Sequence, residues 1–116
     1  MVYVEGCIFC QIAQGKIPSD VVFETDKLIA FRDIHPKSPV HILIIPKNHV
    51  NPRLDLTQQD VETLPEIFLA AKEITRKEGI GERGFRLIAN VGPESGQEVE
   101  HLHFHILGGK RLGPMG

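Results

Sequence analysis

The sequence predicts an α+β domain in which about five mostly antiparallel strands form one sheet, with one long helix and one or two short helices. Three observations support this fold class. The chain has 116 residues, enough for a single domain with one buried core. Short runs rich in β-branched and aromatic residues are separated by turn residues, as strands are. One longer segment repeats apolar residues at helical spacing, and we expect the helices to pack on one face of the sheet.

The first half of the chain predicts a short helix and three strands. The helical pattern covers residues 11–14 and stops at Gly15. The expected strands cover residues 21–24, 28–32 and 41–45. A three-residue turn joins the first two as a hairpin, and the third is apolar enough to be covered on both faces before Pro46 ends it. Residues 54–63 are polar and predict at most one short helical turn.

The second half predicts the long helix and two more strands. Thr63 and Glu66 fit a capping box at its start, where Pro65 is tolerated in the first turn. The helix is expected to bury one stripe, formed by Leu64, Ile67, Phe68, Ala71 and Ile74. Gly79 suits the position after its end. The last expected strands cover residues 85–90 and 99–107, and a tail rich in Gly and Pro covers residues 108–116. We therefore expect one domain over residues 1–116.

Bulk charge and hydropathy exclude several classes of protein. The formal net charge is −2, which disfavours a nucleic-acid scaffold or a polybasic membrane binder. No apolar run approaches the roughly 20 residues of a spanning helix. Residues 1–5 lack a signal-peptide pattern. We expect a cytoplasmic protein without a nucleic-acid or membrane partner.

Residues 101–107 place a histidine at every second position, as His101, His103 and His105. In an extended strand these rings share one face, while the apolar residues between them face a core. Four interpretations are open: a solvated face, a metal bound by all three rings, an acid/base cluster, or a nucleophilic histidine with helpers. The three-ring metal is strained, because strand rise sets the outer Cα atoms about 13 Å apart.

The nucleophile interpretation has favourable chemistry. A neutral imidazole is available near pH 7, since its pKa is about 6.5. It can attack phosphorus and later leave, which splits one difficult displacement into two. His103 is the natural nucleophile, because a neighbour on each side can orient it or donate to phosphoryl oxygens. The sequence has no phosphate loop and no paired-carboxylate magnesium motif, so we expect no Mg²⁺ requirement.

Cys7 and Cys10 form a C-x-x-C pair, which is typical of a redox motif or of half a zinc site. Redox use would favour a βαβ pattern beside it, and none is predicted. Zinc needs four ligands, and His49 with one histidine of the 101–105 run can complete the set. The remaining alternative is two reduced, partly buried cysteines.

These motifs together resemble the histidine-triad (HIT) superfamily, whose signature is H-x-H-x-H followed by two apolar residues. The similarity extends over essentially the whole chain. The other segments that carry it are residues 7–10, 15–18, 30–34, 39–41, 45–49, 96–97 and 107–109, together with Asn90 and Gly92. The tail at residues 112–115 is most similar to the Hint branch, particularly its bacterial members, which are nucleoside phosphoramidases.

The resemblance implies hydrolysis of purine nucleoside phosphoramidates, of the AMP-amine type. His103 would attack the α-phosphate and form a nucleotidyl-histidine, from which water releases a nucleoside monophosphate. His41 and His105 would line the phosphate site, and Asp33 would bind the ribose hydroxyls. The other implied nucleotide-binding residues are Ile8, Phe9, Phe31, Ile34, Asn90, Gly96, Gln97 and Glu98.

Some of these roles have plain structural alternatives. Phe31 and Ile34 could pack in the core instead of lining a base slot. Asp33 could be a turn or cap residue ahead of Pro36. Glu98 departs from the many relatives that carry Ser or Thr there, whose hydroxyl is thought to reach the leaving group. A carboxylate could protonate a leaving amine if its pKa were raised, or it could point to solvent.

The resemblance further implies a structural zinc ion on Cys7, Cys10, His49 and His101. It also implies a homodimer in which the long helix and an edge strand join two sheets into one. Three rival functions stay open. They are a dinucleoside polyphosphate hydrolase or nucleotidyl transferase of the same superfamily, a non-catalytic nucleotide-binding adaptor, and a zinc module without a substrate.

Overall fold

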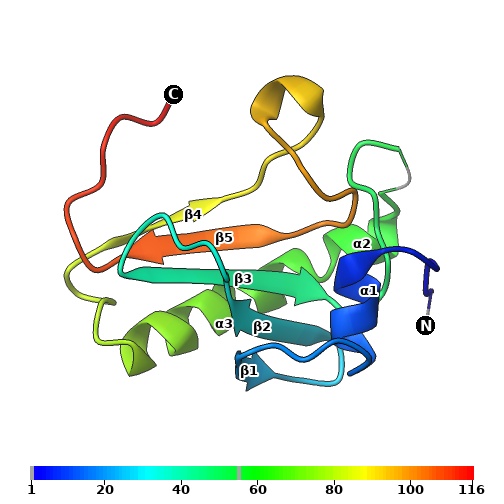
Figure 1. The fold of residues 1–116 in the computed structure, drawn as a ribbon, viewed down its shortest axis with the longest axis horizontal. Coiled ribbons are helices and arrows are strands. Elements are labelled where there is room, and N and C mark those ends of the chain that lie inside the picture. The colour runs from blue at the N-terminus through cyan, green and yellow to red at the C-terminus, as the bar shows by residue number, and fades with distance from the viewer. Residues whose placement is uncertain (1, 55) are drawn as a thin grey trace.

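The computed structural model describes residues 2–54 and 56–116. Over these residues, five strands form one sheet in the order β1-β2-β3-β5-β4 (Figure 1). The strands are β1 Val21–Glu24, β2 Leu28–Arg32, β3 Val40–Pro46, β4 Phe85–Ile88 and β5 Phe104–Gly108. Every neighbouring pair is antiparallel. The predicted fold class is confirmed, and so is the hairpin formed by the first two strands.

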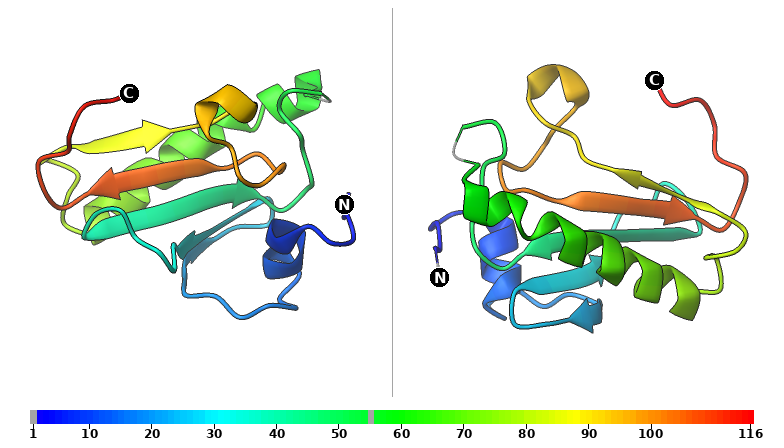
Figure 2. Two further views of the ribbon diagram at one scale, coloured as in Figure 1. Left: turned by 45° about the horizontal axis from the view of Figure 1, so that its top comes forward. Right: turned by 180° about the vertical axis from the view of Figure 1, so that it is seen from behind.

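The helices lie on both faces of the sheet, so the prediction of a single covered face is wrong. The described helices are α1 Ile8–Ala13, α2 Gln58–Val61, α3 Leu64–Lys77 and the 3₁₀ turn η1 Pro93–Ser95. The long helix α3 crosses one face and the short helix α1 lies against the other (Figure 2). The physical reason is β3, which sends Ile42 and Ile44 into the core under α3 and Leu43 and Ile45 into a second core with α1. Because β3 is apolar on both faces, each face must be buried against a helix.

Helix α3 buries a stripe that only partly matches the predicted one, because Phe68 is exposed, Leu64 is only half-buried, and Ala70 and Thr75 join the buried face. Ile67, Ala70, Ala71 and Ile74 are all within 2% of full burial. These positions are spaced i, i+3, i+4 and i+7, which defines one helix face. Phe68 lies one residue further round the helix and is 62% exposed. The prediction that Phe68 is buried is therefore wrong, and α3 presents it to the outside.

The helix start also differs from the prediction. Thr63 makes no capping bond with its side chain, and its hydroxyl donates to the carbonyl of Asp60 at 2.6 Å. The capping box belongs to α2, where Asp60 N–H donates to the Thr57 hydroxyl and Thr57 N–H donates to the Asp60 carboxylate. Helix α2 is followed almost directly by α3, so a single capping box at Thr57 caps the start of the two consecutive helices. Gly79 follows α3 at φ +74°, as predicted.

Several element boundaries differ from the predicted ones. Helix α1 begins at Ile8 because the Cys7 thiol accepts a hydrogen bond from Cys10 N–H and caps it. Strand β4 ends at Ile88. Strand β5 begins only at Phe104, opposite Ile44 of β3, so the predicted strand over residues 99–107 is wrong in its first half. The residues before Phe104 follow the loop after β3 instead, with Leu102 N–H donating to Val50 O at 2.7 Å.

Candidate active site and metal centre

A cavity of about 300 Å³ lies on the α1 side of the sheet. Its walls come from α1, β3, β5 and the segment before it, the end of β4, and the loops before β3 and after β4. It is lined by Phe9, Asp33, Lys37, His41, Leu43, Ile88, Asn90, Gly96, Glu98, Val99, His103, His105 and Leu107. Strand alternation directs His105 into the cavity, because its two neighbours in β5, Phe104 and Ile106, pack toward α3. Leu43 of β3 stands directly opposite His105, which brings His41 diagonally next to it.

His103 presents one reactive nitrogen to this cavity. Its Nδ1 lies 2.7 Å from the backbone carbonyl of His101. A carbonyl can only accept, so Nδ1 carries the proton and Nε2 keeps a free lone pair. Burial lowers the pKa of His103, which keeps the ring neutral near pH 7. The Phe9 ring packs edge-on against it with the centroids 5.1 Å apart, which holds its orientation.

His41 and His105 form a relay whose proton positions follow from a backbone donor. Lys37 N–H donates to His41 Nδ1 at 3.0 Å, so the proton of neutral His41 is on Nε2. That Nε2–H donates to His105 Nδ1 at 2.9 Å. His105 must then carry its own proton on Nε2. Burial lowers the pKa of His105 to about 4 and also lowers that of His41. His105 therefore offers an uncharged N–H donor, which suits a phosphoryl oxygen.

Asp33 closes this cluster at the loop side. One of its carboxylate oxygens accepts from His35 N–H at 2.8 Å, and the other lies 3.5 Å from His41 Nε2. Potential ligand atoms of Asp33, His41 and His105 lie within 4.8 Å of one another. The facing ring nitrogens share a proton, however, and a metal would need both lone pairs. The arrangement is a hydrogen-bonded relay rather than a ligand set.

The other predicted nucleotide-binding residues fall into two groups. Phe9, Asn90, Gly96 and Glu98 line the cavity with the histidines. Ile8, Phe31, Ile34 and Gln97 are not among its lining residues. Phe31 is buried in the α1-side core behind Phe9, whereas Ile34 is 86% exposed.

Gln97 holds the loop rather than facing the cavity. Its side-chain carbonyl accepts from Gly92 N–H at 2.7 Å, and its amide donates to Val99 O at 3.0 Å. Both ends of the amide are therefore used to close the loop after β4. This loop carries Gly96 and Glu98 into the cavity wall.

Sequence reasoning missed five lining residues, which are Lys37, Leu43, Ile88, Val99 and Leu107. Strand alternation could have found two of them, since Leu43 shares a face with His41 and Leu107 with His105. Lys37 lies in a loop, where no periodicity indicates the direction of a side chain.

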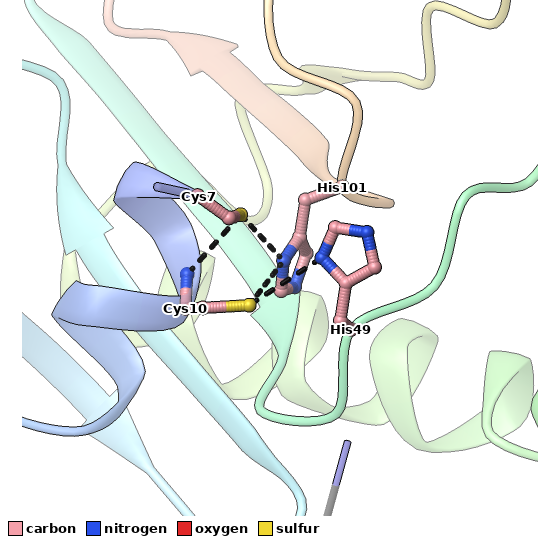
Figure 3. A group of neighbouring side chains, drawn as sticks. All are labelled: Cys7, Cys10, His49 and His101. Atoms are coloured by element: carbon pink, nitrogen blue, oxygen red, sulfur yellow. Dashed lines mark hydrogen bonds between the residues drawn. The ribbon is translucent and has the colours of Figure 1, made fainter. Parts of the chain in front are cut away.

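The second cluster joins residues from three distant segments (Figure 3). Cys7 and Cys10 come from the start of α1, His49 from the loop after β3, and His101 from the segment before β5. The Cys7 sulfur lies 3.4 Å from His101 Nδ1. The Cys10 sulfur lies 3.4 Å from His49 Nδ1 and 3.6 Å from His101 Nδ1. All four candidate ligand atoms lie within 4.8 Å of one another.

This donor set fits tetrahedral zinc. Zn–S bonds of about 2.3 Å and Zn–N bonds of about 2.0–2.1 Å set neighbouring S and N atoms about 3.6 Å apart. His101 Nε2 donates to Pro46 O at 2.8 Å, which leaves its Nδ1 lone pair directed at the sulfurs. Burial lowers the pKa of His101 to about 4, so the ring is neutral and able to ligate. Burial raises the pKa of the Cys10 thiol, and a bound cation would reverse that effect.

His101 belongs to both clusters. Its ring faces the cysteines while its carbonyl accepts the proton of His103 Nδ1. Phe9 lies between the two cysteines in the sequence, and its ring contacts the imidazole rings of both His101 and His103. The candidate metal centre and the candidate nucleophile are therefore joined through one residue's backbone.

A five-stranded antiparallel sheet with a histidine triad beside a small cavity defines a class of proteins, the HIT family. This chain belongs to that family, since the HIT domain model matches residues 14–112. It is similar to the purine nucleoside phosphoramidase of Escherichia coli (strain K12), at 45% identity over 111 residues, 96% of this chain and 93% of that protein.

Solved structures of HIT family proteins have the same fold as this chain. A histidine triad protein from Clostridium difficile superposes with a TM-score of 0.94 at 41% identity, covering 99% of this chain and 100% of that one. A HIT family hydrolase from Legionella pneumophila superposes with a TM-score of 0.88 at 48% identity, covering 93% and 96%. The chain is accordingly a hydrolase of the HIT family. Within residues 2–54 and 56–116, no helix has the length and apolar character to cross a membrane.

Proposed function

We propose that this enzyme hydrolyses purine nucleoside phosphoramidates through a covalent intermediate on His103. The observation that carries the proposal is the Nδ1–H bond from His103 to a backbone carbonyl, which leaves Nε2 as a neutral nucleophile in the cavity. The substrate class is supported by the similarity to the Escherichia coli purine nucleoside phosphoramidase.

The reaction then proceeds in two displacements. His103 Nε2 forms a bond to the α-phosphorus as the P–N bond breaks, and the leaving nitrogen takes the bonding pair and one proton. Glu98, on the cavity wall, is the candidate donor of that proton. Water then attacks phosphorus, His103 leaves with its electron pair, and the proton of the water returns to the donor. His105 Nε2–H stabilises the phosphoryl oxygens in both steps.

The nucleoside would occupy the cavity and its rim. Asp33 would bind the ribose hydroxyls, with Phe9 against the base and Ile8, Phe31 and Ile34 completing or backing the slot. Asn90 and Gly96 would contact the phosphate, and Gln97 would hold their loop. A volume of about 300 Å³ is at the small end of ligand sites, consistent with a monophosphate unit whose base lies toward the rim.

We further propose that Cys7, Cys10, His49 and His101 hold a structural zinc ion. Four protein ligands close the coordination shell, so the ion serves the fold and the chemistry stays with the histidines. The fit of the S···N separations to a zinc tetrahedron supports this assignment.

A homodimer is the proposed assembly. Strand β4 lies at the edge of the sheet, and Phe85 on it and Phe68 and Leu69 on α3 are exposed. A hollow of about 830 Å³ runs between α3 and β4 and includes Phe68 and Phe85. A second copy would cover this apolar surface and pair the edge. We also expect a cytoplasmic location.

Mass spectrometry of the protein with a slowly hydrolysed adenosine phosphoramidate tests the proposed function. We expect a nucleotidyl adduct on His103, and we expect His103→Ala to lose both adduct and turnover. His35→Ala removes a histidine outside the cavity and should leave turnover unchanged. Unaltered turnover in His103→Ala would refute the mechanism. Faster turnover of a dinucleoside polyphosphate would instead refute the substrate class.

A further inference from the structure

The catalytic cavity is short of positive charge. Of the described residues that line it, Asp33 and Glu98 bring two carboxylates, and Lys37 is the one side chain with a permanent positive charge. His41 and His105 add none near pH 7, because burial lowers their pKa values. A phosphate entering the cavity thus meets two acidic side chains, and only one cation opposes them.

Lys37 is held at the cavity by its backbone. Its N–H donates to His41 Nδ1 at 3.0 Å, which fixes this part of the loop against the histidine relay. Its ammonium group also lowers the pKa values of both His41 and His105. The positive charge therefore acts on the same side of the cavity as the proposed phosphate site.

The ammonium of Lys37 has no competing ion-pair partner within the described part of the chain. Several other cations do have one: Arg32 pairs with Asp20 and Glu78, Lys47 with Glu24, Arg53 with Glu100, and Arg76 with Glu73. The Lys37 residue is exposed, so its ammonium can turn toward a ligand without breaking an ion pair. Its charge is therefore available to a substrate.

We propose that the Lys37 ammonium binds the substrate phosphate and offsets the two carboxylates of the cavity wall. This inference rests on the proposed function and names the residue that would supply electrostatic attraction at a site where we expect no magnesium requirement. A Lys side chain suits the task, because it is a compact point charge on a flexible stem.

Calorimetric titration with adenosine monophosphate and with adenosine tests the proposal, because the two ligands differ only in the phosphate. Lys37→Gln keeps the backbone N–H but loses the charge. At low ionic strength we expect it to weaken adenosine monophosphate binding about 5- to 10-fold, the effect of one solvent-accessible charge pair with a phosphate. Adenosine binding should change less than 2-fold, and Lys37→Arg should retain most of the affinity.

Lys27→Gln is the matched control, since Lys27 is an exposed lysine in the turn between β1 and β2. It changes the net charge equally, and neither affinity should move. Equal affinity of the wild type and Lys37→Gln for adenosine monophosphate would overturn the role of Lys37. Equal weakening of adenosine monophosphate and adenosine binding would also overturn it, because the substitution would then have disturbed the loop around Lys37 rather than a phosphate contact. If the wild type bound neither ligand, the proposed function itself would fall.

Discussion

His103 owes its reactive nitrogen to a backbone carbonyl two residues earlier. The carbonyl of His101 fixes the proton on Nδ1, and the backbone N–H of Lys37 fixes the opposite tautomer in His41. Main-chain groups do not titrate, so the tautomers of neutral His103 and His41 do not change with pH. At the scale of single residues, the three histidines of the triad have three different surroundings and three different proposed roles.

The pH dependence of the reaction follows from the environment of His103. Burial lowers its pKa, so the neutral nucleophile persists below the ordinary imidazole value of about 6.5. We expect kcat/KM for an adenosine phosphoramidate to stay level as the pH falls through 6.5, and to decline only at more acidic pH. Circular dichroism at each pH separates this decline from acid unfolding. A half-maximal rate at or above pH 6.5 would contradict the prediction.

The role of Glu98 can be tested through the leaving group. If its carboxyl donates the proton, Glu98→Gln should slow alkylamine substrates about 10- to 100-fold, because such amines leave poorly without protonation. Arylamine substrates need less help and should slow much less. Glu94→Gln, in the exposed turn η1, is the control and should affect neither. Equal slowing of both substrate types would assign Glu98 to binding instead.

At the scale of elements, the cysteine–histidine cluster ties three separate segments together. Helix α1, the loop after β3 and the segment before β5 all contribute candidate ligands to it, and the last of these carries the carbonyl that orients His103. The segment lies outside the regular strand ladder, since β5 begins at Phe104. Zinc would therefore act with the Leu102 N–H to Val50 O hydrogen bond to hold residues 101–103 in place of strand pairing.

Metal content and its loss test this arrangement. Protein purified without chelator should contain about one zinc ion per chain, and Cys10→Ser should contain far less. We expect the variant's Tm to fall by about 10 °C or more, since a bound structural metal contributes to folding free energy. Its kcat should drop because the zinc ion no longer fixes His101, whose carbonyl orients the His103 ring. Wild type stripped with a chelator should match the variant. A metal-free wild type as purified would refute the site.

At the scale of the whole molecule, one group of exposed apolar side chains lies at the β4 edge of the sheet and on α3, as Phe85, Phe68 and Leu69. Phe68→Glu would place a charge in the proposed interface of α3 and β4 and should convert a dimer to monomers in sedimentation velocity experiments. Leu54→Glu is the control, because Leu54 is similarly exposed, at 70% against 62%, but lies in a loop outside the hollow. A monomeric wild type, or a Phe68→Glu variant that stays dimeric, would contradict the assembly.

Local spacing determined which face each side chain takes. Period-two alternation was enough to put His105 on the face opposite Phe104 and Ile106, and helical spacing placed Ile67, Ala71 and Ile74 in the core. The same rules set the bounds of β1 and β2 without error. These predictions succeeded because they depend only on neighbours within one element.

Only the tertiary structure decided which elements meet. Strand β5 begins where its pairing with β3 begins, at Phe104. Because both faces of the sheet are apolar, α1 and α3 pack on opposite sides of it. Cys7 and His101 are 94 residues apart, and no local rule states that the cysteines face a histidine ring whose carbonyl orients the proposed nucleophile. Lys37 enters the cavity through a loop that has no period at all. Sequence spacing determines the direction of a side chain, whereas folding determines what it faces.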